Sequence, residues 1–140
     1  MVIIACIDTN GTMMFNGRRQ SQDRLLRKRV IEMTKGHKLY MNNYTAEQFE
    51  EYSDIITVDE DYLSIAQFGD YCFVEDDKFY AYQDRIDKLI LYKWNEAYPY
   101  DMHFPLDFTL DEWTFIRKTD FVGSSHDRIT EEIYTLNEAK

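Results

Sequence analysis

The sequence predicts an α/β fold: a three-layer arrangement with a mostly parallel central sheet, helices on both faces and a C-terminal antiparallel hairpin. Short, continuously apolar runs at 2–7, 71–74 and 89–92 have the pattern of strands that are buried on both faces. Segments with helical spacing or cap residues separate these runs, and such alternation is typical of parallel sheets covered by helices. The last two runs, 113–118 and 129–136, alternate between apolar and polar residues, as antiparallel edge strands do.

The segment Asp23–Met33 is predicted to be an amphipathic helix that follows the first strand. Its apolar residues recur at i, i+4 and i+7 from Leu26, which is the spacing of one helical face. The side chain of Ser21 or Asp23 can cap the first turn. Gly36 is expected to end the helix, because glycine adopts the left-handed conformation that often follows a last turn.

The remaining elements are predicted in chain order from the same kinds of signal. They are a strand at 37–41, a helix at 45–51 capped by Thr45, a strand at 54–58, a helical turn or two at 59–66, a strand at 71–74, a short helix at 79–84, a strand at 89–92 and two antiparallel strands at 113–118 and 129–136. The Gly123-Ser124-Ser125 segment is expected to form the turn region between the last two strands.

Length and composition favour one domain that spans residues 1–140. The chain is 44% hydrophobic, and only five Gly and two Pro leave little room for linkers. The opening apolar run lacks a basic leader and is too short for a signal peptide, and no stretch approaches the roughly 18 apolar residues of a membrane span. We therefore expect a soluble, cytoplasmic protein in which Cys6 and Cys72 are reduced core thiols.

Charge is unevenly distributed along the chain. Residues 1–38 carry a net charge of +5, whereas the whole chain carries −10. The sequence thus describes a basic helix on an acidic body. A net acidic protein repels nucleic acid, so direct binding of DNA or RNA is not expected. The basic cluster can still hold a single anion.

Several local strings occur in an order that is informative when they are taken together. The chain opens with Ile3-Ile4-Ala5-Cys6-Ile7-Asp8-Thr9-Asn10-Gly11 and continues with Thr34-Lys35-Gly36-His37-Lys38-Leu39-Tyr40-Met41. Near its end come Asp101-Met102-His103-Phe104-Pro105 and Asp111-Glu112-Trp113. In order and approximate spacing these strings resemble the dihydrofolate reductase family, in a divergent and shortened form. The resemblance covers about residues 2–49 and 70–136, and it implies a dihydrofolate reductase-like α/β fold.

The chain is also similar to a group of short bacterial proteins that are labelled ribonuclease Z. That label implies a metal centre, but the sequence contains no His-x-His-x-Asp-His string. No metal site is therefore predicted.

No cofactor is expected, because the residues that would hold the phosphates of a nicotinamide dinucleotide differ from those of the family. In the family a Gly-Gly pair follows the strand that corresponds to 71–74, and its backbone N–H groups can approach the phosphates. This chain carries Glu75-Asp76-Asp77 there, and three carboxylates repel a phosphate. The family's basic residue after the second strand is replaced by Asn42-Asn43. NADPH-dependent reduction is therefore judged unlikely.

On the substrate side, the resemblance assigns to Asp23 the role of the acidic residue that protonates the pterin. The loop before Asp23 is shorter than in the family, and Tyr92 stands where a small hydroxyl residue would assist the carboxylate. Asp23 is thus the one candidate catalytic residue.

The crevice of such a fold lies at the carboxyl ends of the parallel strands. Cationic, amide, acidic and aromatic side chains are expected there, a mixture that suits a polar, planar or phosphorylated ligand. The candidate ligand-binding residues are Arg18, Arg19, Ser21, Gln22, Asn42, Glu75, Asp76, Trp94 and Asn95. The alternative is a solvated loop whose arginines pair with the acidic body.

One further string, Ser124-Ser125-His126-Asp127, contains the residue types of a hydrolytic triad. Adjacent side chains diverge, whereas a triad needs residues that converge from separate segments. The sequence therefore favours a hairpin turn at this position.

Three functions follow from these observations. The first is binding of a small polar or anionic ligand, such as a nucleotide, a pterin or a signalling molecule, in the inherited cleft. The second is that of an acidic interaction or inhibitor protein, of the type that phages and mobile elements carry, which engages a basic protein partner. The third is an NADPH-dependent reductase. The oligomeric state is left open.

Overall fold

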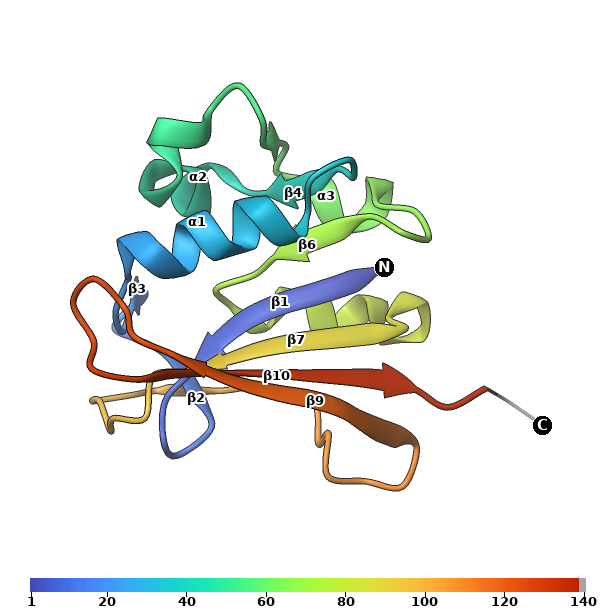
Figure 1. The fold of residues 1–140 in the computed structure, drawn as a ribbon. Helices are drawn as coiled ribbons and strands as arrows, with labels where there is room; N and C mark the ends of the chain where they lie inside the picture. Colours follow the sequence, from blue (N-terminus) through green and yellow to red (C-terminus); the bar gives the residue numbers. More distant parts are fainter. Residues whose placement is uncertain (139–140) are drawn as a thin grey trace.

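A seven-stranded sheet forms the centre of the computed structural model, which describes residues 1–138 (Figure 1). The strand order is β5-β4-β6-β1-β7-β10-β9. The first five strands in this order are parallel, and β10 runs antiparallel to both β7 and β9. The strands are β1 (Val2–Ile7), β4 (Leu39–Met41), β5 (Thr57–Val58), β6 (Tyr71–Phe73), β7 (Lys88–Lys93), β9 (Trp113–Phe121) and β10 (Ile129–Leu136).

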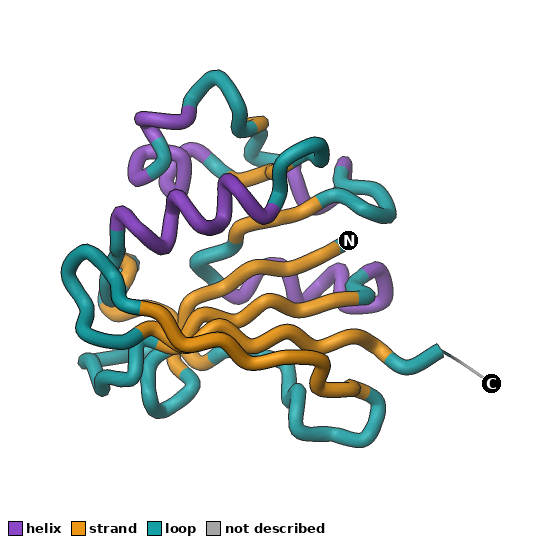
Figure 2. Tube along the Cα trace, viewed as in Figure 1, coloured by secondary structure: helices purple, strands orange, loops and turns teal. Residues whose placement is uncertain are grey.

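Three α-helices and two 3-10 helices connect the strands (Figure 2). They are α1 (Arg24–Met33), α2 (Asn43–Gln48), η1 (Glu50–Tyr52), α3 (Tyr62–Ile65) and η2 (Asp77–Arg85). Asp23 rather than Ser21 caps the start of α1, and the C-cap residue at its end is Thr34, ahead of Gly36. The expected Thr45 cap of α2 is wrong, because the Asn42 side chain accepts a hydrogen bond from the Thr45 N–H. No helix within residues 1–138 is long and apolar enough to cross a bilayer.

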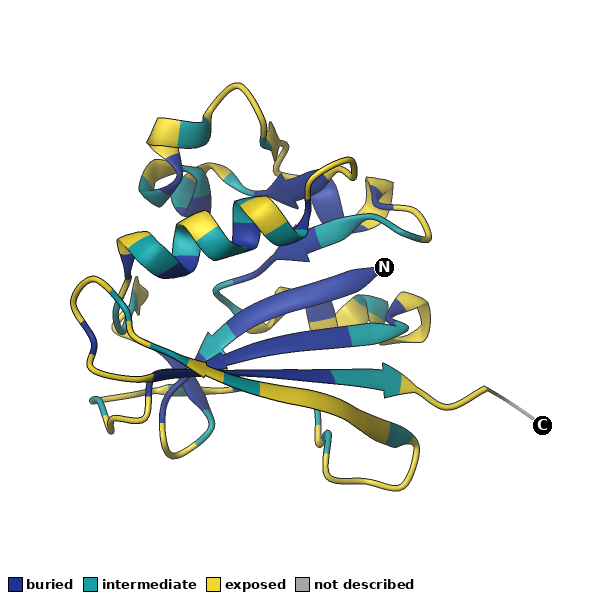
Figure 3. Cartoon of the chain, viewed as in Figure 1, coloured by how far each residue is buried: buried dark blue, intermediate teal, exposed yellow. Residues whose placement is uncertain are grey.

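Helices cover both faces of the sheet, as the sequence predicts. Successive residues of β1 point to opposite faces, so Ile4 packs in one cluster with Leu26 of α1. Ile3 packs in the other cluster with Leu63 of α3 and Phe79 of η2. Figure 3 shows the buried residues concentrated on the central strands and on the inward sides of the helices. Each face thus has its own apolar core.

Both cysteines are free thiols; Cys72 is buried, whereas Cys6 is partly buried and packs against one of the two clusters. Burial raises the pKa of Cys72 to about 12. Cys72 is therefore an inert core thiol under ordinary conditions.

A second, three-stranded sheet was not predicted from the sequence. It consists of β3 (Arg18–Arg19), β2 (Thr12–Phe15) and β8 (Met102–His103) in that order. The turn between β2 and β3 is Asn16-Gly17, and both residues have positive φ, 54° and 71°. Asn-Gly is the preferred pair for a two-residue hairpin turn, so the chain does carry a local signal for this hairpin.

The expected alternation of the C-terminal strands is wrong in detail. The first five residues of β10 are all buried, and Ile129 and Ile133 pack in the cluster that contains Leu26 of α1. Buried Glu131 of β10 accepts two hydrogen bonds from Arg29 of α1, at 2.7 and 3.2 Å, and one from the Tyr92 hydroxyl at 2.8 Å. These contacts compensate for burying a carboxylate and fix α1 against β10.

Replacing Arg29 with Ala is predicted to destabilise the protein by about 3 kcal/mol, because Glu131 would remain buried with the loss of its cationic partner. The matched control is Arg27→Ala on the same helix. Arg27 pairs with Glu51, which is 44% exposed, and loss of such a pair costs about 1 kcal/mol or less. Urea unfolding measures both changes, and equal losses would contradict the assignment of Arg29–Glu131 as a structural pair.

Candidate functional site

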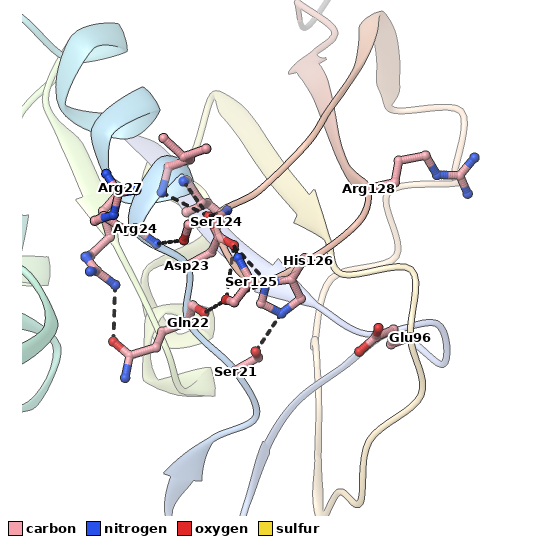
Figure 4. A network of polar contacts seen from close by, with 12 residues as sticks. Ser21, Gln22, Asp23, Arg24, Arg27, Glu96, Ser124, Ser125, His126 and Arg128 are labelled. Atoms are coloured by element: carbon pink, nitrogen blue, oxygen red, sulfur yellow. Dashed lines mark hydrogen bonds and ion pairs between the residues drawn. The ribbon is translucent and has the colours of Figure 1, made fainter.

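Three segments that are distant in sequence meet at the carboxyl end of the parallel strands. They are the segment 20–23 before α1, the hairpin loop 122–128 between β9 and β10, and Trp94, which directly follows β7. Figure 1 shows the β9–β10 loop reaching to the start of α1, and Figure 4 shows the polar contacts between these segments. Asp23 lies where they join.

The Asp23 carboxylate is buried and accepts hydrogen bonds on both oxygens. Oδ1 accepts from the backbone N–H groups of Leu25, Leu26 and Ser124 at 2.9–3.1 Å. Oδ2 accepts from the Ser125 N–H at 2.9 Å and lies 2.9 Å from Nδ1 of His126. Burial alone would raise the pKa of Asp23, but the hydrogen bonds from Ser125, His126 and Ser124 outweigh it and hold the pKa well below its usual value. Asp23 is therefore a fully paired anion, an arrangement unlike that of a proton donor.

Gly123 allows this close approach of the hairpin loop to Asp23. A Cβ atom at residue 123 would lie 2.4 Å from Oδ2 of Asp23 and 2.9 Å from Cδ1 of Ile129. Both neighbours are buried, so neither can move away freely. The loop conformation thus requires a residue without a side chain at this position.

His126 is held on three sides. Its Nδ1 faces Asp23, its Nε2 lies 2.7 Å from Oγ of Ser21, and its ring stacks on Trp94 with a centroid distance of 4.5 Å and an interplanar angle of 25°. The imidazole is only 8% exposed. Sequence reasoning did not place this histidine in the site, because its partners Ser21 and Asp23 come from the other end of the chain.

Arg19 and Glu75 form the opposite wall of the site. The guanidinium donates to both carboxylate oxygens of Glu75, at 2.7 and 3.0 Å. It also donates to the backbone oxygen of Tyr44 and lies over the Tyr44 ring, 4.3 Å from the centroid. The side chains of Arg19 and Glu75 are only 18% and 10% exposed. The carboxylate that replaces the expected glycine thus serves as the partner of Arg19.

The cavity between these walls has a volume of about 10 Å³. That is about the space that one water molecule needs, so the cavity as it stands is too small for an organic ligand. It is lined by Cys6, Met13, Arg19, Gln20, Ser21, Asp23, Leu26, Gln48, Phe73, Val74, Glu75 and Trp94.

The structure brings only part of the sequence-predicted set to this cavity. Arg19, Ser21, Asp23, Glu75 and Trp94 line it.

The other candidates lie outside the cavity, and most have local structural contacts. Gln22 accepts a hydrogen bond from Arg27, and Asn42 and Asp76 cap α2 and η2. The Asn95 amide donates to the Thr130 hydroxyl and to a backbone oxygen of the C-terminal hairpin. Short polar side chains at the ends of strands commonly cap helices and turns, which explains these positions.

Arg18 lines a larger and more open pocket at the mouth of the cleft. This mouth pocket has a volume of about 340 Å³ and is lined by Phe15, Asn16, Arg18, Arg19, Gln20, Tyr98 and Pro99. Arg19 and Gln20 line both the mouth pocket and the inner cavity. Sequence reasoning missed Phe15, Gln20 and Tyr98, because they converge only through the β2–β3 hairpin.

Comparison with solved structures gives a clear likeness. The chain is similar to a dihydrofolate reductase from Enterococcus faecalis complexed with NADP(H) and RAB-propyl, with a TM-score of 0.65 and 14% sequence identity over 98% of this chain and 96% of that chain. The chain has a dihydrofolate reductase-like fold. This confirms the expected fold, and at such low identity the likeness extends to the fold alone. No protein-family model and no curated protein matches the sequence.

Within the dihydrofolate reductase-like fold, residues 1–138 bring together no group of three or more His, Cys, Asp or Glu side chains that could hold a metal ion. The carboxylates of the acidic run Glu75-Asp76-Asp77 do not act as one group, because two of them have different partners. Glu75 pairs with Arg19, and Asp76 caps η2.

Replacing Gly123 with Ala is predicted to destabilise the protein by about 1–3 kcal/mol, because the new methyl group overlaps the Asp23 carboxylate and Ile129. The control is Val122→Ala at the neighbouring residue, which is 70% exposed and is expected to change stability by about 0.5 kcal/mol or less. Thermal or urea unfolding compares the two, and a neutral Gly123→Ala would contradict the close approach.

The low pKa of Asp23 predicts a specific dependence of stability on pH. Because the pKa is lower in the folded state than the 3.8 of the free side chain, the carboxylate stabilises the fold above pH 3.8. This contribution falls as the pH is lowered from there towards the folded-state value. The Asp23→Asn variant should be less stable than wild type near pH 6, and the difference should shrink at acid pH in urea unfolding. A constant difference would show that the charge of Asp23 has no such role.

Proposed function

We propose that the protein binds a small, planar, anionic ligand in the mouth pocket of the cleft. The observation that carries this proposal is the combination of a pocket of about 340 Å³ with an exposed arginine, Arg18, in its wall. Small-molecule sites are typically concave, a few hundred Å³ in volume and lined by apolar groups with a few polar ones.

The charges around the pocket support Arg18 as the group that meets the anion. Arg19 is already neutralised by Glu75 through two hydrogen bonds. Within residues 1–138, Arg18 makes no ion pair. It lies opposite Phe15 in the β2–β3 hairpin, and both residues line the mouth pocket. A guanidinium that is free in this way can form a bidentate contact with a phosphate or carboxylate.

The other residues of the mouth pocket support a planar ligand. Phe15 is 47% exposed, and with Tyr98 and Pro99 it offers apolar surface against which a flat ring can pack. Asn16 and Gln20 add amide groups that can hydrogen-bond to the polar edge of such a ring.

The position of Glu75 argues against the reductase hypothesis. Glu75 follows β6 after one residue, and its carboxylate lies at the wall of the inner cavity, bonded to Arg19. The pair is neutral overall, so Arg19 is not available to meet the phosphates of a nicotinamide dinucleotide. A nucleotide in the mouth pocket would instead meet Arg18.

Isothermal titration with AMP, inorganic phosphate and NADPH tests the proposal. AMP should bind saturably and more tightly than inorganic phosphate, because its base adds contacts with the apolar wall. Arg18→Ala should weaken AMP binding by roughly tenfold to a hundredfold, the effect of one lost charge-assisted hydrogen-bonded contact. The matched control is Arg24→Ala, an exposed arginine of α1 that does not line the pocket, which should leave binding unchanged.

Absence of AMP binding up to millimolar concentration, or equal binding by Arg18→Ala and wild type, would contradict the proposal. Tighter binding of NADPH than of AMP would instead favour the reductase hypothesis.

The second candidate is a protein that engages a basic partner, and one feature favours it. Residues 39–77 contain eleven Asp and Glu and no Lys or Arg. Part of this segment forms a groove of about 400 Å³ in which Ile56 and Val58 lie beside Glu47 and Glu50. The negative charge of this segment would attract a basic protein, and binding through such charges weakens as the salt concentration rises.

A further inference from the structure

Ser21, His126 and Asp23 form a continuous chain of hydrogen bonds. Oγ of Ser21 lies 2.7 Å from Nε2 of His126, and Nδ1 of His126 lies 2.9 Å from Oδ2 of Asp23. Figure 4 shows the imidazole between the hydroxyl and the carboxylate. The two ring nitrogens thus face two different partners, which is the connectivity of a nucleophile, a base and an orienting anion.

The protonation pattern of this chain follows from Asp23. Its carboxylate is held as an anion by backbone N–H groups, so it can only accept a hydrogen bond from the ring. In the neutral imidazole the proton therefore resides on Nδ1. Nε2 is then a lone-pair acceptor, and the Ser21 hydroxyl donates to it. This is the tautomer that a general base needs.

The surroundings hold the three groups in place. Trp94 stacks on the imidazole and limits its rotation. Asp23 is fixed at the N-terminus of α1, and the hairpin loop that carries His126 is tied to it through Ser124 and Ser125. The base is therefore oriented by packing and by several hydrogen bonds, as an efficient catalytic group must be.

Ser21 is also placed for access. It is only partly buried, and it directly follows Gln20, which lines the mouth pocket. Ser21 lines the inner cavity of about 10 Å³, which cannot hold an acyl group, so an electrophile must reach Ser21 from outside this cavity.

We propose that Ser21 is a nucleophile for acyl transfer from small carboxylic esters, with His126 as its general base and Asp23 as the residue that positions His126. Oγ of Ser21 forms a bond to the acyl carbon while its proton passes to Nε2 of His126. The bond from the acyl carbon to the alcohol oxygen then breaks, and the leaving alcohol takes the proton from His126. Water, deprotonated by His126, hydrolyses the acyl-Ser21 ester and restores the hydroxyl.

This activity goes beyond the proposed ligand binding and does not need Arg18. Its failure would leave AMP binding untouched, and a failure of AMP binding would leave the reactivity of Ser21 to be measured separately.

The experiment is covalent labelling of the full chain with an alkyl fluorophosphonate, followed by mass spectrometry of the intact protein and of its peptides. In this reaction the Ser21 oxygen forms a bond to phosphorus, the bond from phosphorus to fluorine breaks, and fluoride leaves. We expect one adduct, on Ser21, and none in Ser21→Ala. His126→Gln should slow the labelling by at least a hundredfold, the usual scale of general-base assistance.

Ser64→Ala is the matched control, because Ser64 is an exposed serine on α3 whose hydroxyl donates only to the backbone oxygen of Asp61, and labelling of this variant should equal that of wild type. Wild-type protein in urea should not be labelled, which keeps the test decisive even if His126→Gln fails to fold. No adduct on Ser21, an adduct on another serine, or equal labelling of native and urea-unfolded wild type would overturn the proposal.

Discussion

The buried carboxylate of Asp23 is the interaction on which the rest of the site depends. It caps α1 through Leu25 and Leu26 and at the same time binds the loop between β9 and β10 through Ser124, Ser125 and His126. One anion thus joins the first helix to the C-terminal hairpin. A buried charge is tolerated only when it is fully hydrogen-bonded, so neither the helix start nor the loop can shift without exposing an unpaired group. Asp23 therefore fixes the position of His126, which in turn contacts Ser21 and Trp94.

A second ion pair explains how the fold accommodates its departures from the reductase pattern. Glu75 stands where the resemblance to the reductase family implies a glycine, and Arg19 donates hydrogen bonds to both of its carboxylate oxygens. The pair closes the inner cleft and leaves only about 10 Å³. Of the two spaces, the mouth pocket of about 340 Å³ is therefore the larger, and Arg18 in its wall makes no ion pair among the described residues. The proposed ligand site lies there.

Much of the fold could be predicted because its signals are local. The apolar runs of β1, β6 and β7 and the helical spacing of α1 need no knowledge of distant residues. The β2–β3 hairpin was missed although Asn16-Gly17 is a strong turn signal, because its strands are too short to show alternation. The expected alternation of β10 was wrong because a glutamate such as Glu131 is normally taken for a surface residue. Its burial depends on hydrogen bonds from Arg29 and Tyr92, which the local sequence does not reveal.

The sequence by itself determined the fold class, the order of its main elements, the acidic character of the chain and the presence of three consecutive carboxylates shortly after β6. It also identified five residues that line the inner cavity. Only the tertiary structure decided that Arg19 forms an ion pair with Glu75 and that Asn42 and Asp76 cap helices. It also decided that His126 lies between Ser21 and Asp23. The physical reason is distance along the chain. Pairing of side chains a hundred residues apart depends on how the sheet brings its strand ends together, and no local pattern encodes it.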